Sequence, residues 1–357
     1  MDTQSDATQF RARAGLLRRA WALRREIAGA VVHWSGLGRA FEIATRANGA
    51  IILMYHSVAD GDAAAFVEPA MRMSPAEFER QMAFLSHHRS VVPLSVLVEE
   101  IAAGRTSPAG TVCITFDDGY LDNLTVAAPI LEKYRLPATL YLATRYVEQC
   151  EPQWADRLHR ALERRTADAL SIAEVELDVA RLDSAPGRAT ARRRLHRHLL
   201  ECGFDERLRL LREMEDQLKP SGRMPRLTLG WDDVRALRRR YPMFEIGGHT
   251  RDHADLRKHR GKSALAQIDD CAADLRRELG VAPQHFSFPY ERWCRETRNM
   301  VAANGWRSAV GSGDAFRIVA ESDRYAMPRV ESPSSMTELR FKTSGAYPGT
   351  LALLGLA

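Results

Sequence analysis

Residues 114–119 read Ile-Thr-Phe-Asp-Asp-Gly and complete an apolar run that begins at Thr111. A short apolar run that ends in polar residues is typical of a buried strand. Because side chains alternate along a strand, we expect Asp117 and Asp118 to point in roughly opposite directions. Two close carboxylates are costly unless a cation or a donor satisfies them, so one could bind a metal while the other acts as a base. A helix cap is the alternative, since Asp and Gly commonly precede a helix.

The same pattern recurs on both sides of this stretch. We expect further strands at residues 50–56, 91–93, 138–143, 243–246, 285–288 and 308–310. Helical patterns separate them, as at residues 74–86, where Ser74 is the expected cap and Pro75 occupies the first turn. Strands that alternate with helices predict an α/β fold, a parallel sheet with both faces covered.

Two arginine-rich segments lie outside the alternation. Residues 146–226 are mostly helical in pattern and are interpreted as an insertion between two α/β units. Residues 8–48 carry apolar side chains at helical spacing among many arginines. This pattern indicates either an amphipathic helix on an anionic membrane face or a helix packed on the main domain. We favour the second, because any surface helix is amphipathic.

Composition excludes several classes of protein. Of 357 residues, 45% are hydrophobic and 27% are charged, which excludes wholesale disorder, collagen and coiled coils. The sequence has no apolar run of about 18 residues, so we predict no transmembrane helix. The 51 basic residues nearly balance the 46 acidic ones, and a net charge of +5 does not by itself indicate nucleic acid. The N-terminus lacks the basic region of a secretory signal, so we expect a cytoplasmic protein or one peripheral to the membrane.

Two more motifs follow predicted strands. Residues 247–253 read Gly-Gly-His-Thr-Arg-Asp-His, and histidines four apart lie on one side of a helical turn, where both can bind one ion. Residues 286–290 read Phe-Ser-Phe-Pro-Tyr, a strand that runs into a turn. Each motif alone is a weak signal. Together they supply one Asp and two His as metal ligands, with a second Asp left as a base. In an α/β barrel the strand ends converge on one face, where active sites are built.

The sequence resembles the polysaccharide deacetylases, the NodB homology family or carbohydrate esterase family 4. The resemblance is carried by Thr115–Gly119, His249-Thr250 with His253, Phe286–Tyr290, Leu53–His56, Leu136–Leu142, Ile246–Thr250 and Met327–Val330. It implies a distorted (β/α) barrel with a helical insertion. The expected domains are a barrel at 49–145 and 227–335, an insertion at 146–226, an N-terminal amphipathic Arg-rich segment at 1–48 and a C-terminal tail at 336–357.

The family also implies roles for individual residues. Asp118, His249 and His253 would bind a divalent metal, most often Zn²⁺, with Co²⁺, Ni²⁺ or Mn²⁺ as alternatives. Asp117 would be the general base that takes a proton from the attacking water. The backbone N–H of Tyr290, in the turn that begins at Pro289, would hold the oxyanion.

The sequence departs from the family pattern in two places. The family usually has an Arg two residues before the proline of its third motif, where this chain has Ser287. Arg329 is our candidate to pair with the base instead, and Arg292 is its competitor. The late motif with a catalytic-acid histidine is absent. We therefore expect His56, at the end of the first strand, to donate the proton to the leaving amine, with a plain hydrogen bond to the strand end as the alternative.

The resemblance implies a metal-dependent hydrolase that removes acetyl groups from the N-acetylated sugars of a polysaccharide, an oligosaccharide or a glycolipid. Exopolysaccharide biosynthesis is the implied setting. The alternatives are an O-acetyl esterase on glycans and a non-catalytic carbohydrate-binding relative, although the two acids and two histidines of the motifs are all present. We expect no nucleic-acid partner, because acidic residues are interleaved with the arginines of the insertion and no binding motif occurs there.

Overall fold

The computed structural model describes residues 47–175, 177–280, 282–313 and 316–344. Nearly all of the expected N-terminal amphipathic segment at 1–48 lies outside this part, and so do residues 345–357 of the expected tail. The possible membrane contact of residues 8–48 is therefore not addressed by the structure. None of the helices in the described ranges combines the length and the apolar character that crossing a bilayer requires.

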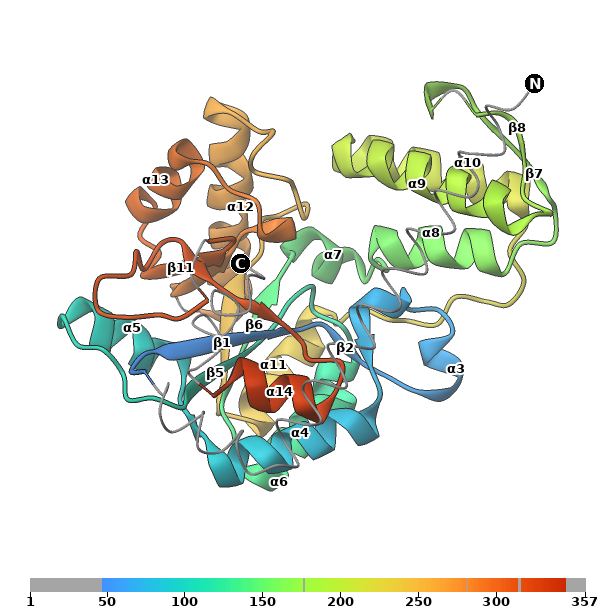
Figure 1. Cartoon of the computed structure of the whole chain (residues 1–357). Helices are drawn as coiled ribbons and strands as arrows, with labels where there is room; N and C mark the ends of the chain where they lie inside the picture. The colour runs from blue at the N-terminus through green and yellow to red at the C-terminus, as the bar shows by residue number, and fades with distance from the viewer. Residues whose placement is uncertain (1–46, 176, 281, 314–315, 345–357) are drawn as a thin grey trace, which may run out of the picture.

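A parallel sheet that nearly closes on itself forms the centre of the molecule (Figure 1). Its strands are β1 (Ala50–Tyr55), β4 (Ser90–Val91), β5 (Thr111–Phe116), β6 (Ala138–Leu142), β9 (Phe244–Gly248), β10 (His285–Ser287), β11 (Ser308–Gly311), β12 (Met327–Pro328) and β13 (Val330–Glu331). They follow the order β12-β11-β10-β9-β6-β5-β1-β13, and β4 pairs with β5 outside this path. Every pairing in the sheet is parallel. The predicted distorted (β/α) barrel is confirmed.

The two ends of the sheet are joined by a single residue. β12 pairs with β11 at one end of the order, and β13 pairs with β1 at the other. Arg329 is the only residue between β12 and β13 in the chain. The sheet therefore comes closest to closing at Arg329.

Helices cover the sheet and bury it. They are α4 (Pro75–His88), α5 (Leu94–Ala102), α6 (Ala128–Tyr134), α7 (Thr144–Gln149), α11 (Trp231–Arg240), α12 (Gly261–Leu279), α13 (Arg295–Ala303) and α14 (Met336–Lys342). Strands β1, β5 and β6 are buried at every position, as expected of a sheet covered on both faces. Leu53, Ile114, Leu140, Leu275 and Phe286 belong to one buried hydrophobic cluster, which holds the strand ends in register.

Short elements connect these layers. Strands β2 (Ser57–Val58) and β3 (Arg72–Met73) pair beside the sheet, and α3 (Gly61–Ala64) and η1 (Pro69–Met71) lie between them in the chain. A π-helical turn, η2 (Asn123–Ala127), leads into α6, and a 3₁₀ turn, η4 (Pro289–Glu291), follows β10. Helical turns of the π type often occur near functional sites.

The insertion forms a second hydrophobic cluster of its own. It contains α8 (Trp154–Glu163), β7 (Ala169–Ile172), η3 (Ala173–Val175), β8 (Leu177–Arg181), α9 (Ala185–Glu201) and α10 (Phe204–Leu218). Leu170, Leu195, Leu211 and Met214 are buried together there. The expectation of a mostly helical segment omitted the antiparallel hairpin of β7 and β8. Figure 1 shows this insert beside the barrel, with the hairpin at its outer end.

Candidate metal centre and active site

The residues singled out in the sequence come together at the carboxyl ends of the barrel strands. Parallel strands end on the same face, so the loops that follow them meet there. In the structure, His56 follows β1, Asp117 and Asp118 follow β5, His249 follows β9, Pro289 and Tyr290 follow β10, and Arg329 lies between β12 and β13.

Asp118, His249 and His253 form a buried cluster that could hold a metal ion. Each offers one ligand atom, and these atoms lie within 4.8 Å of one another. Asp118 Oδ1 is 3.0 Å from His253 Nε2 and 3.7 Å from His249 Nε2. Among the residues that the structure describes, no other group of three such side chains meets this geometry.

The donor atoms of this cluster fit a divalent cation. Asp118 Oδ1 is buried without a hydrogen bond of proper geometry, which is costly unless a cation takes that place. His249 Nδ1 lies 2.8 Å from the backbone oxygen of Ser287. Because that oxygen can only accept, Nδ1 carries the proton and the lone pair of Nε2 faces the cluster. Carboxylate oxygen and imidazole nitrogen are the ligands expected for zinc.

Burial and charge set the protonation states in the cluster. Burial lowers the pKa of His249 to about 4, so its ring is neutral, as a metal ligand must be. Burial acts to raise the pKa of Asp118, but the neighbouring histidines, His253 first among them, together outweigh it and hold that pKa below its usual range. The cluster therefore presents one carboxylate and a neutral His249 ring without any rearrangement.

The backbone around the cluster differs from the sequence-based expectation. Asp118 has φ 72°, so it leaves the strand conformation, and its carboxylate does not point away from that of Asp117. Both carboxylates approach His249 Nε2, at 3.8 Å for Asp117 and 3.7 Å for Asp118. The histidines do not share a helical turn either, because Thr250 and His253 have left-handed φ values of 59° and 54°. The prediction that the two carboxylates point in opposite directions, and that the two histidines share a helical turn, was therefore wrong.

Gly247 is needed where β9 approaches its neighbours. A Cβ atom at Gly247 would lie 2.5 Å from the backbone oxygen of His285 and 2.5 Å from the Tyr141 ring. No side chain fits there without a shift of the backbone. The glycines before His249 thus allow the close strand packing that brings this histidine to the site.

Asp117 is paired with Arg329 inside the barrel. The guanidinium donates to both carboxylate oxygens, at 2.7 and 2.6 Å, and both side chains are buried. Burial acts to raise the pKa of Asp117, but the Arg329 charge and then His249 outweigh it, so the pKa lies below its ordinary value. Arg292, the competing candidate, pairs instead with Asp255 at 3.0 Å.

Glu291 is a site residue that sequence reasoning missed. Arg329 Nε donates to Glu291 Oε1 at 2.9 Å, and a terminal nitrogen of the same guanidinium also contacts that oxygen. Burial raises the pKa of Glu291, although the Arg329 charge opposes it. Arg329 also donates to Ser287 Oγ at 3.0 Å. The only available signal was that Glu291 directly follows the Pro-Tyr motif.

His56 lies next to the acids of the site. Its charge helps to lower the pKa of Asp117, Asp118 and Glu291. In each case burial and other neighbouring groups have a larger effect on that pKa than His56 has. The backbone oxygen of His56 accepts a hydrogen bond from Asn123 Nδ2 at 2.7 Å, so the loop after β5 fixes the end of β1. The His56 side chain is half-buried.

Tyr290 forms one wall of the metal cluster. Its ring meets the His253 ring edge-on, with centroids 4.6 Å apart. Its backbone is left-handed, at φ 59°, in the turn that Pro289 begins. Trp154 Nε1, from the insert, donates to the Tyr290 hydroxyl at 2.9 Å. Trp154 is a second residue that no local motif identified.

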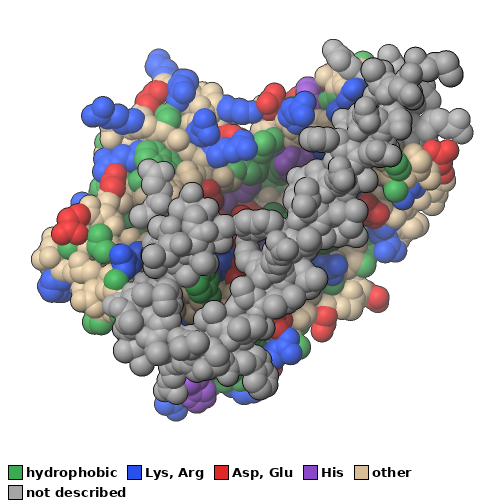
Figure 2. All heavy atoms as spheres, in the orientation of Figure 1, with side chains coloured by type: hydrophobic (Ala, Val, Ile, Leu, Met, Phe, Trp, Pro, Cys, Tyr) green, Lys and Arg blue, Asp and Glu red, His purple; other side chains and the backbone are tan. Residues whose placement is uncertain are grey.

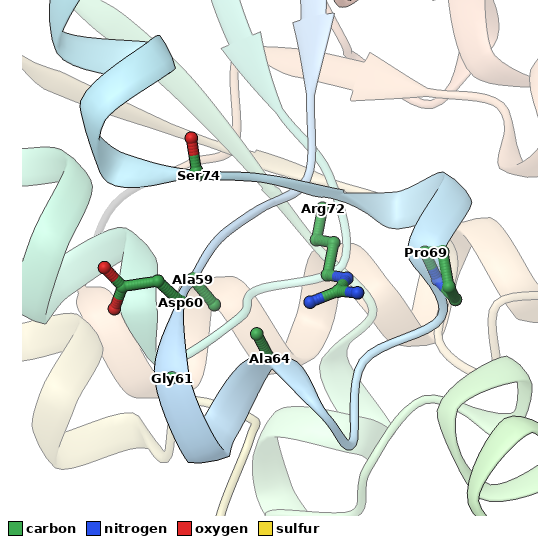
Figure 3. A pocket seen from close by; sticks show the side chains of 7 residues that line it. All are labelled: Ala59, Asp60, Gly61, Ala64, Pro69, Arg72 and Ser74. Carbon is green, nitrogen blue, oxygen red and sulfur yellow. The ribbon is translucent and has the colours of Figure 1, made fainter. Parts of the chain in front are cut away.

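The face of the molecule between the barrel and the insert is hollowed, with basic side chains along its edge. Figure 2 shows hydrophobic and histidine side chains in the recess between the barrel and the insert. A separate hollow of about 450 Å³ is lined by residues between Ala59 and Ser74, and Arg72 extends toward α3 there (Figure 3). That hollow contains none of the clustered acids and histidines, so we assign it no part in the chemistry.

The comparisons with known proteins agree with this architecture. The family model described as polysaccharide deacetylase matches residues 104–177 and 204–309. The Bacillus subtilis (strain 168) protein named "Putative polysaccharide deacetylase YxkH" is 33% identical over 93 residues, which are 26% of this chain. The match spans 30% of the length of that relative.

Two solved structures share the fold at low sequence identity. The Streptococcus pyogenes deacetylase PplD, in complex with acetate, has a TM-score of 0.55 at 15% identity, over 83% of this chain and 98% of that one. IcaB from Ammonifex degensii has a TM-score of 0.53 at 14% identity, over 85% and 97%. Because the residues that the family model matches make up half of the chain, this chain belongs to the polysaccharide deacetylase family.

Proposed function

We propose that this protein is a metal-dependent hydrolase that removes acetyl groups from N-acetylated sugars of a glycan. The observation that carries the proposal is a buried Asp/His/His cluster with a second carboxylate beside it, which Arg329 keeps ionised. Family membership supports acetyl removal, and the retained acids and histidines argue against a non-catalytic relative.

Asp118, His249 and His253 are the residues that would hold the metal. A divalent ion bound there supplies a Lewis acid that polarises the acetyl carbonyl and makes water more acidic. We propose Zn²⁺, because the ligands are two imidazoles and one carboxylate, with Co²⁺, Ni²⁺ and Mn²⁺ as alternatives. The neutral His249 ring and the unsatisfied Asp118 Oδ1 prepare the site for this ion.

Asp117 and His56 divide the proton transfers in this proposal. Asp117 Oδ2, which lies 3.8 Å from His249 Nε2, takes the proton of the attacking water. The backbone N–H of Tyr290 donates to the oxygen that becomes negative as water adds to the carbonyl. His56 then gives a proton to the sugar nitrogen as the C–N bond breaks. The products are acetic acid, which ionises to acetate, and a free amine, and the proton that Asp117 took from water replaces the one that His56 gave, so atoms and charge balance.

The substrate is proposed from the family. A polysaccharide, an oligosaccharide or a lipid-linked glycan of exopolysaccharide biosynthesis would offer the required N-acetyl groups. A cytoplasmic position is the corresponding proposal for location, with contact of residues 8–48 with an anionic membrane surface as the alternative to their packing on the main domain.

An acetate-release screen tests the function. Purified protein should contain about one divalent ion per chain and release acetate from N-acetylated sugar polymers, oligomers or glycolipids. The screen should include O-acetylated glycans of the same lengths, which distinguish an esterase from an amide hydrolase. Metal-loaded protein that releases no acetate from any of these substrates would contradict the proposal.

A further inference from the structure

The first turn of α8 reaches from the insert into the metal centre. Gln153, which precedes the helix, donates from Nε2 to the backbone oxygen of Asp118 at 3.3 Å. Trp154 donates to the Tyr290 hydroxyl at 2.9 Å. Gln153 and Trp154 are each only 3% exposed. Two consecutive insert residues thus contact the metal-ligand loop after β5 and the turn after β10.

Both contacted residues have costly backbone conformations. Asp118 and Tyr290 are not glycines, yet their φ values are 72° and 59°. Such conformations are unfavourable for residues other than glycine and persist only when surrounding contacts enforce them. The hydrogen bonds from Gln153 and Trp154 are contacts that can hold these conformations, because Asp118 and Tyr290 are the residues that accept them.

A third contact fixes α8 against the barrel. Asp156, in the same first turn of α8, accepts from the Tyr120 hydroxyl at 3.0 Å and from the Glu68 backbone N–H at 2.8 Å. Asp156 is fully buried, and Tyr120 lies two residues after Asp118 in the same loop. α8 therefore contacts the loop after β5 at two points.

Trp154 is itself held firmly within the insert. Its ring packs on His196, with centroids 5.0 Å apart, and the Arg207 guanidinium lies 5.5 Å from its ring centre. Arg207 is buried and donates to the backbone oxygens of Leu199 and Cys202, at 2.8 and 2.9 Å. The insert core thus sets the direction in which the Trp154 N–H points.

We propose that Gln153 and Trp154 are positioning residues for the metal centre, so that the insert is part of the catalytic unit. Gln153 acts on the ligand Asp118 through its backbone. Trp154 acts on the ligand His253 through the Tyr290 ring, whose edge-on contact with that imidazole limits its rotation. The inference rests on the metal site of the proposed function, but it concerns binding of the ion and not the substrate.

The test measures metal affinity in Trp154→Phe, which keeps an aromatic ring but removes the N–H. Zn²⁺ affinity is determined by competition with a chromophoric chelator, and the absorption spectrum of the Co²⁺ form reports ligand geometry. We expect affinity to fall roughly tenfold, as for other residues that orient metal ligands, and the Co²⁺ spectrum to change. With a glycan substrate, kcat should fall while KM changes less than about twofold, since Trp154 is buried.

Trp231→Phe is the matched control. Trp231 lies at the start of α11, and its buried Nε1 has no hydrogen-bond partner among the described residues. The same chemical change there should leave Zn²⁺ affinity and the Co²⁺ spectrum unaltered. Thermal unfolding of the metal-free variants separates a loss of affinity from a loss of folded protein.

A double-mutant cycle identifies the route of the effect. If Trp154 acts through the Tyr290 hydroxyl, Trp154→Phe should weaken metal binding by less than about twofold in a Tyr290→Phe background. Gln153→Met, which keeps length but loses the donor, should independently weaken binding several-fold, and it tests the proposal even if Trp154→Phe folds poorly. Wild-type Zn²⁺ affinity in both folded variants, or full additivity in the cycle, would overturn the inference. Weakened metal binding in a protein that releases no acetate would leave it standing while refuting the proposed function.

Discussion

Arg329 holds the Asp117 carboxylate by two parallel hydrogen bonds of 2.7 and 2.6 Å, buried at the carboxyl ends of the barrel strands. Bidentate pairs of this kind are stronger than single ones and fix the orientation of the carboxylate. Arg329 is also the residue at which the two ends of the sheet meet. The residue at which the sheet ends meet is thus also the one whose side chain keeps the proposed base ionised.

Replacing Arg329 should therefore change the pH profile of the reaction. A base must be ionised to act, so activity is lost as pH falls through its pKa. In Arg329→Met, burial is no longer opposed by the guanidinium, and the pKa of Asp117 rises. We expect the acidic limb of the kcat/KM profile to move upward by at least about one pH unit, together with a lower maximum.

Arg292→Met is the control for this profile. Arg292 carries the same charge near the site, but it pairs with Asp255 and not with Asp117. Its replacement should leave the acidic limb where it is. If Arg329→Met kept the wild-type profile, or Arg292→Met moved it, the pairing would not be what sets the pKa of the base.

Changing the adjacent acids Asp117 and Asp118 to Asn, one at a time, should impair the enzyme for two different reasons. Asp117→Asn should keep its metal and lose about 10³-fold in kcat, because the proton acceptor is gone. Asp118→Asn should lose metal affinity, because a neutral amide oxygen replaces the anionic ligand of the cluster. Metal content by elemental analysis, measured beside acetate release, distinguishes the two. Full activity of Asp118→Asn at limiting metal would contradict the assignment.

Long strands and their polar ends were predictable because local physics determines them. β1, β5 and β6 are mostly apolar along their whole length. A strand that is buried on both faces has this composition, so such strands can be recognised from the sequence alone. Since parallel strands end on one face, the convergence of the motifs after β5, β9 and β10 followed from the fold. The roles of the individual residues within the site stay predictions.

Contacts that depend on tertiary packing were not predictable in the same way. β12 and β13 have two residues each, too few to show a period, so the sequence did not reveal where the sheet ends meet. The inward turn of the Asp118 carboxylate depends on a positive φ that Asp adopts only rarely. Trp154 and Glu291 reach the site only through the placement of the insert and of η4, for which one sequence offers no rule.

His56 should matter in proportion to how much the leaving group needs a proton. A sugar amine is a poor leaving group unless it is protonated, whereas a phenolate leaves without help. We expect His56→Ala to lower kcat on an N-acetyl sugar by about 10²-fold or more but to affect an aryl acetate only slightly. His87→Ala, at an exposed histidine near the end of α4, serves as the control. Equal losses on both substrates would argue against a proton-donating role.

Asp156 should make the insert less stable as pH rises. Burial, the largest cause, raises the pKa of Asp156 to about 8, from an ordinary value near 3.8. Between these values the folded chain binds a proton that the unfolded chain has released, so the free energy of unfolding falls with pH by at most about 1.4 kcal/mol per unit. Above about pH 8 both states are ionised and this contribution stops changing.

Asp156→Asn isolates this contribution, because the amide resembles the protonated acid and can still accept from Glu68 N–H. The variant should lose the part of the pH dependence that Asp156 causes, and its advantage over the wild type should grow from pH 5 to pH 8. Urea unfolding at a series of pH values measures the difference, with Asp62→Asn, at an exposed aspartate, as the control. Parallel stability curves for wild type and Asp156→Asn would show that Asp156 is already ionised in the folded protein, so that Tyr120 and Glu68 would be donating to a charged carboxylate.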